Sequence, residues 1–138
     1  MNRHCPSLGR REIEGANLAA LGRAYADLGK AREAIEYYEQ ALPISRETGD
    51  RRGEGANLAD QGRAYADLEE ARKAIGYCEQ ALAISREIGD RRGEGNALWN
   101  MSLALEKLGD KSKAILFAEA ALKIEDHRAE KVKRTLQE

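Results

Sequence analysis

The sequence predicts an all-α fold, a solenoid built from repeated helix pairs. A pattern recurs at a step of forty residues, so that Asn17 returns as Asn57, and 27 of 36 positions are identical between residues 15–50 and 55–90. A looser third copy begins at Gly95 and keeps the same register. Charged residues make up 34% of the chain and aromatic residues only 5%, which suits long helices better than a sheet. A fixed period of this size is the signature of stacked helical repeats.

Each repeat is predicted to hold two helices. In the first, helix A runs from about residue 10 to 28, where Leu18, Leu21, Tyr25 and Leu28 recur at three- and four-residue spacing. Helix B runs from about residue 31 to 48. The predicted domain is a single one, with a loose end at 1–9, repeats at 10–50, 51–90 and 91–125, and a final capping helix at 126–138.

Glycine and aspartate mark the predicted helix ends. Gly29, Gly49 and Gly89 stand where a left-handed C-terminal cap is expected. Asp50 is placed to cap the N-terminus of the next helix A, and Asp90 and Asp110 recur at similar junctions. Asp126 is expected to start the capping helix, with Ala129, Val132 and Leu136 as its apolar stripe.

Several positions depart from the regular pattern. Gln61 replaces an apolar residue and would bury an amide that needs partners. Pro43 interrupts a helix B, where a kink or break is expected. Glu69 takes the place of a capping glycine, and Gly76 lies in mid-helix. The first fourteen residues align with the end of a repeat, which suggests a piece of a longer array or a relative that lost its front.

The motif Leu18-x2-Leu21-Gly22-x2-Tyr25, followed by Ala34-x3-Tyr38 and Ala41, resembles the tetratricopeptide repeat (TPR). The forty-residue step resembles the long-helix subtype of Pins/LGN-type scaffolds and prokaryotic TPR proteins. The resemblance implies a right-handed superhelical solenoid of three TPR helix-turn-helix units plus the C-terminal capping helix. It also implies a groove, lined by the A helices, that takes a peptide or helix of a partner protein. Transferred position by position, the groove residues are Asn17, Ala20, Arg23, Asp27, Asn57, Asp60, Arg63, Asp67, Asn96, Trp99, Asn100 and Leu103.

Structural roles compete with partner binding at these positions. Arg23 with Asp27, and Arg63 with Asp67, are four residues apart and can pair on one helix. Trp99 can serve as an aromatic anchor or pack under the C-terminal helix. The two recurrent asparagines, Asn17 and Asn57, have either a structural role or a role in ligand recognition. The arginine pairs at residues 51–52 and 91–92 are either framework residues or phosphate binders. For those arginine pairs, framework roles are favoured over phosphate binding.

The net charge and the absence of known motifs exclude several classes of function. The net charge is −1, which argues against nucleic acid or an anionic membrane as a partner. No apolar run approaches the roughly 18 residues that span a bilayer. The start of the chain lacks the apolar core of a secretion signal, so a cytoplasmic location is expected. The common catalytic motifs are missing, so no enzyme activity, cofactor or metal is predicted. The sequence therefore predicts a protein-interaction scaffold, with self-assembly into a homo-oligomer through open solenoid ends as the alternative.

Overall fold

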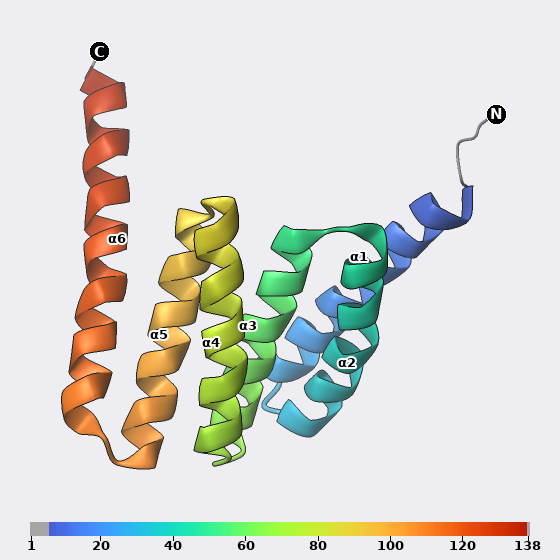
Figure 1. The fold of residues 1–138 in the computed structure, drawn as a ribbon, viewed down its shortest axis with the longest axis horizontal. Helices are drawn as coiled ribbons and strands as arrows, with labels where there is room; N and C mark the ends of the chain where they lie inside the picture. The colour runs from blue at the N-terminus through green and yellow to red at the C-terminus, as the bar shows by residue number, and fades with distance from the viewer. Residues whose placement is uncertain (1–5, 138) are drawn as a thin grey trace.

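The computed structural model describes residues 6–137, apart from the side chains of residues 6–8, 128, 129, 131 and 132. Six α-helices and no strands are found in this part of the chain (Figure 1). The helices are α1 (Pro6–Asp27), α2 (Ala31–Thr48), α3 (Arg51–Asp67), α4 (Ala71–Ile88), α5 (Arg91–Leu108) and α6 (Lys111–Gln137). The predicted all-α solenoid of helix pairs is confirmed. None of these helices is long and apolar enough to cross a membrane.

The helices stack in chain order, each packed on the next (Figure 1). Consecutive A helices also touch, α1 with α3 and α3 with α5, whereas the B helices α2, α4 and α6 meet only A helices among the described residues. The A helices therefore form an inner layer, and the B helices form the outer one. This arrangement gives each interior A helix two B neighbours, one from its own repeat and one from the repeat before it.

The helix caps form at all of the predicted junctions except Asp126. Gly29, Gly49, Gly89 and Gly109 have positive φ angles between 70° and 96°. In repeat two, Glu69 holds the corresponding position with a φ of 63°, as the only described non-glycine residue in that region. At the other helix ends, the side chains of Asp50 and Asp90 accept hydrogen bonds from the backbone N–H of Gly53 and Gly93. Asp110 accepts from Lys113 N–H in the same way. These local contacts explain the short breaks between helices.

Two helix ends differ from the prediction. Helix α6 continues without a break to Gln137, so the expected separate start at Asp126 is wrong and its final segment occupies the place of the capping helix. The reason is local, because the positions of Gly49 and Gly89 are taken in repeat three by the helix former Ala129. Of the expected apolar stripe, Leu136 is exposed, and the side chains of Ala129 and Val132 lie outside the described set.

Helix α1 begins at Pro6, four residues before its predicted start, so the end of the chain up to residue 9 is not all loose. Arg10 stands where the later repeats have a capping aspartate, so nothing stops the helix there. Proline suits the first helical position because its missing N–H would be unsatisfied in any case.

Pro43 does not break α2, contrary to the expected interruption. Its side chain lies on the exposed face of the helix. The carbonyl of Glu39, which loses its backbone donor to the proline, is therefore on the side where water can reach it. The position that corresponds to Pro43 in repeat two, Ala83, is exposed as well.

Helix A and helix B of each repeat approach closely at one small residue. A Cβ atom on Gly22 would lie 2.5 Å from the ring of Tyr38, and one on Gly62 would lie 2.5 Å from the sulfur of Cys78. Both partner side chains are almost fully buried. At the equivalent positions repeat three has Ser102 and Ala118, a larger residue and a smaller one. The sizes therefore compensate from repeat to repeat, as close packing requires.

Gln61 is buried, as predicted, with 1% of its surface exposed. Its Oε1 atom accepts no hydrogen bond from any described residue. The corresponding residue of repeat three, Met101, is equally buried and packs against Cys78 and Leu105. Repeat two thus places an amide where repeat three places a thioether.

Candidate functional site

The inner layer carries a cavity of about 900 Å³ between α3, α5 and α6. Predicted groove residues line it from α3 and from α5, and α6 closes one side with Ala121 and Leu122. The predicted groove residues in this cavity are Asp60, Arg63, Asn96, Trp99 and Asn100.

A smaller cavity of about 210 Å³ lies between α1, α2 and α3. It contains two further predicted residues, Arg23 and Asn57. The remaining five predicted residues line neither cavity. Among them, Asn17, Ala20, Asp27 and Asp67 are exposed on the A helices, and Leu103 is half-buried. The structure thus gathers seven of the twelve predicted residues into two hollows.

Trp99 is 45% exposed and lines the larger cavity. Residues of α6 line the same cavity, so the predicted packing against the C-terminal helix and the predicted anchor role both stay predictions. Leu122 of α6 lines the same cavity and is 55% exposed. These two side chains give the cavity an apolar surface that stays open to solvent.

The charged groove residues are paired, but only partly as predicted. Arg63 lies 3.9 Å from Asp67 on its own helix, which matches the expected four-residue pair. Arg23 instead reaches across to α3, with Nη1 3.6 Å from Oδ2 of Asp60. The expected pair with Asp27 is therefore replaced by a bridge between repeats, because the neighbouring helix A brings a carboxylate to the same side.

Asp60 is a half-buried acid in the cavity, with 29% of its side chain exposed. Burial raises the pKa of its carboxyl to about 6, an effect that the nearby Arg23 partly opposes. Removal from water disfavours the charged form of a carboxylate. The larger cavity therefore contains an acid that changes its charge close to neutral pH.

The arginine pairs divide between two roles. Arg51 contacts Glu54 at 2.9 Å and Glu87 at 2.7 Å, and Arg91 contacts Glu94 at 2.8 Å. These first members are framework residues, as favoured by the sequence. The second members, Arg52 and Arg92, line the larger cavity.

Arg52 and Arg92 were missed as groove residues, although a signal was available. Arg52 precedes Ala56 by four residues, and Arg92 precedes Asn96 by four, so each continues the face of its predicted groove helix. Arg52 Nε lies 3.5 Å from the Asp90 carboxylate, and the Arg52 side chain is 73% exposed. The lining of the cavity therefore combines three arginines with the carboxylates of Asp60, Asp90 and Glu125.

Two of the predicted asparagines hold helices together. Asn57 is buried, and its Nδ2 donates to Ser45 Oγ of α2 at 3.2 Å. Asn100 Nδ2 donates to the carbonyl oxygen of Ala59 at 3.0 Å, which ties α5 to α3. The structural role is thus observed for Asn57, whereas its counterpart Asn17 is exposed on α1.

The comparison with protein families matches residues 12–87, and again residues 55–125, to the tetratricopeptide repeat. Among solved structures, the chain is similar to the TPR domain of FLU from Arabidopsis, with 20% identity over 85% of this chain and 98% of that one and a TM-score of 0.79. It is similar to aspartyl phosphate phosphatase F from Bacillus subtilis, with 15% identity over 91% of this chain and 32% of that one and a TM-score of 0.78. The N-terminal domain of stress-induced protein-1 from C. elegans gives 17% identity, coverage of 83% and 86%, and a TM-score of 0.65. At these identities the likeness concerns the fold alone. The comparison with curated proteins gave no match.

Proposed function

Because this chain belongs to the tetratricopeptide repeat family, we propose that it is a protein-interaction scaffold that holds a peptide or helix of a partner protein between α3, α5 and α6. Helical repeat proteins generally use such extended inner surfaces to bind other proteins. The observation that carries the proposal is the cavity of about 900 Å³ in which Trp99 stays 45% exposed. A large aromatic side chain left open in a hollow is a typical anchor of a protein interface.

The proposed partner segment places a large apolar side chain against Trp99 and Leu122. The three arginines of the lining, Arg52, Arg63 and Arg92, then surround the segment and can donate to its backbone carbonyls or side-chain oxygens. Burial of the apolar side chain supplies most of the binding energy, because exposed charges contribute little in water. The smaller cavity near Arg23, and the exposed residues between the two, are proposed as outer contacts for a longer segment.

Peptides selected from a random display library against the wild-type chain provide the test. Trp99→Ala is expected to weaken their binding at least about tenfold, since truncation of a central anchor removes the best-packed contact. Trp99 is also the only tryptophan in the chain, so its fluorescence reports occupation of the cavity directly.

Leu116→Ala is the matched control, because Leu116 is an exposed apolar residue of α6 that lines neither cavity. The control should bind the selected peptides with wild-type affinity. The proposal would be overturned if the peptides bound Trp99→Ala and the wild type equally and left the tryptophan emission of the wild type unchanged.

Other parts of the proposal rest on sequence and charge. We infer a non-enzymatic role, a cytoplasmic location, the long-helix forty-residue subtype, and no nucleic-acid or membrane partner, supported by the balanced charge of −1. Self-assembly is the second candidate function. It is favoured by exposed apolar residues on the first and last helices, such as Leu21 and Ile115, which are 45% and 59% exposed.

A further inference from the structure

Helix α6 presents an apolar face that the other B helices bury. In α2, Ile35 and Leu42 are 6% and 8% exposed, and they belong to core clusters that include α3 residues. One period further on, Leu82 of α4 is 8% exposed in a cluster with residues of α5. The same repeat positions in α6 are Ile115 and Leu122, which are 59% and 55% exposed. Among the described residues, no helix A covers this face.

Helix α1 presents the complementary face. Leu21 is 45% exposed, although its counterparts Gln61 and Met101 are 1% and 3% exposed. Ala24 is exposed as well, while its counterpart Ala64 is buried against α2 residues in the core. The equivalent side of α3 packs on α2, and that of α5 packs on α4. In α1 this side is exposed.

We propose that α1 of one copy of this chain packs on α6 of a second copy, in the register in which α3 packs on α2. This contact rests on the second candidate function, self-assembly. It specifies which two faces meet and that the copies join head to tail. The occupant is a second copy because the two faces continue an interface that the chain already builds twice, at α2–α3 and at α4–α5. Such a contact joins different surfaces of the two copies, so it is heterologous and can add further copies at either end.

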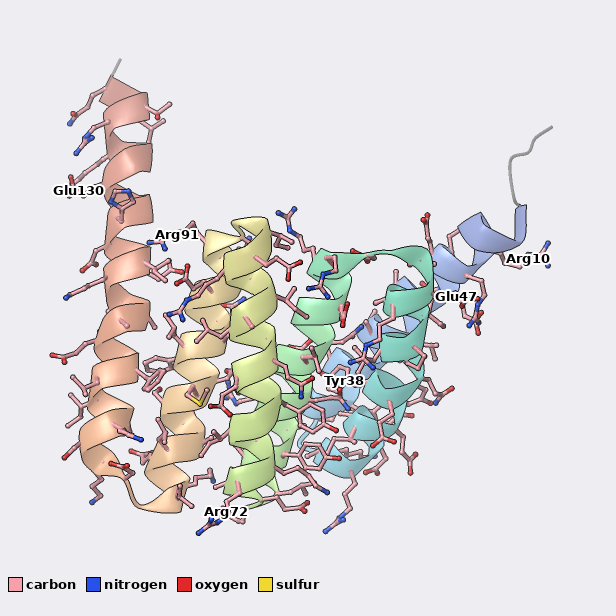
Figure 2. All side chains as sticks on the ribbon, viewed as in Figure 1. Arg10, Tyr38, Glu47, Arg72, Arg91 and Glu130 are labelled. Carbon is pink, nitrogen blue, oxygen red and sulfur yellow. The ribbon has the colours of Figure 1, made fainter. Side chains whose placement is uncertain are left out.

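The lengths of the two helices agree with this arrangement. Helix α6 rises well above α4 and α5, with Glu130 on the overhanging part, and α1 extends past α2 toward the same side, with Arg10 on its extension (Figure 2). In the proposed register, the two overhangs lie side by side and lengthen the contact beyond that of an internal repeat junction.

The same register identifies one unfavourable contact. Internal junctions carry an ion pair from helix B to helix A, Arg46 with Glu54 and Arg86 with Glu94, each at 3.1 Å. The corresponding residues between two copies are Asp126 and Glu14, which are both acidic. Like charges at this position weaken the contact. We therefore expect association that is weaker than the internal junctions and depends on protein concentration.

Two blocking variants test whether the copies join head to tail. Leu21→Arg closes the α1 face and Ile115→Arg closes the α6 face, and neither residue lines a cavity. Light scattering behind a sizing column, over about a hundredfold concentration range, is expected to show self-association of the wild type and the 15.3 kDa monomer for each variant alone. An equimolar mixture should form a dimer and stop there, because each copy keeps one open face and the two open faces match. Leu116→Arg, one residue along α6 on another face, should associate as the wild type does.

The outcomes separate the possibilities. A wild type that stays monomeric overturns both self-assembly and the α1–α6 contact, and leaves the binding cavity unaffected. Self-association that survives Leu21→Arg, with no complementation in the mixture, overturns only the head-to-tail polarity and indicates a symmetric contact.

A gain-of-function variant tests the register. Asp126→Arg recreates the internal ion pair and is expected to raise the association constant by up to about fivefold, the upper end of the range for an exposed ion pair. Asp126→Asn only removes the repulsion and should give a smaller increase. No change in either variant would overturn the proposed register.

Discussion

The buried amide of Gln61 should lower the stability of the protein, and its replacement tests this directly. Gln61→Met is expected to stabilise the protein, because a buried acceptor without a described donor costs about 1–3 kcal/mol. The methionine should fit, since Met101 fills the corresponding position of repeat three at 3% exposure. For a domain of this length the gain corresponds to roughly 3–9 °C in Tm. Urea unfolding followed by circular dichroism measures the free energy of unfolding of both proteins.

Gln80→Met is the matched control for this experiment. Gln80 is an exposed glutamine of α4, and surface substitutions usually change stability by less than about 0.5 kcal/mol. If Gln61→Met unfolds at the same or a lower urea concentration than the wild type, the conclusion that Oε1 is an uncompensated buried acceptor is refuted.

Two further predictions concern the small residue at the helix crossing and the cavity acid. Gly22→Ser should lower the free energy of unfolding by about 1–3 kcal/mol, as overpacking does. Tyr38→Ala removes a buried ring and should itself cost about 3–5 kcal/mol, but in that background Gly22→Ser should cost less than in the wild type. A double-mutant cycle in urea measures this coupling, which would be zero if the ring of Tyr38 were not the obstacle. The folded-state pKa of Asp60 is raised to about 6, so this carboxyl favours folding below its unfolded pKa of about 4 and loses that contribution as the pH rises through 6. Asp60→Asn should therefore be the more stable protein at neutral pH, with a difference that shrinks toward pH 4; parallel pH profiles of the two proteins would contradict this reasoning.

Most of the fold followed from short-range patterns in the sequence. The forty-residue period, the bounds of α2 and the caps at Gly49 and Asp50 were all predicted, because a left-handed glycine or a capping carboxylate depends on only a few neighbouring residues. The errors at Pro6 and Asp126 were of the same local kind. In both places the residue that ends a helix in the other repeats had been replaced, and the helix simply continued.

The candidate site was predicted less completely. The resemblance to the tetratricopeptide repeat implied that Trp99 and Asp60 line the groove, and both line the larger cavity. It did not place Arg52 and Arg92 there, because their recurrence at helix starts suggested only a framework role. Nor did it reveal that Arg23 pairs with Asp60 rather than Asp27, since that choice depends on how far the next helix A lies from α1.

The sequence by itself determined the class of fold, the order of the helices and most of their ends, because backbone conformation is governed by local propensities and caps. Only the tertiary structure decided which of several equivalent residues are buried. Leu21, Gln61 and Met101 hold one position of the repeat, yet the first is 45% exposed and the other two are 1% and 3% exposed. The difference arises because burial requires a neighbouring helix, and α1 has no B helix on its outer side among the described residues.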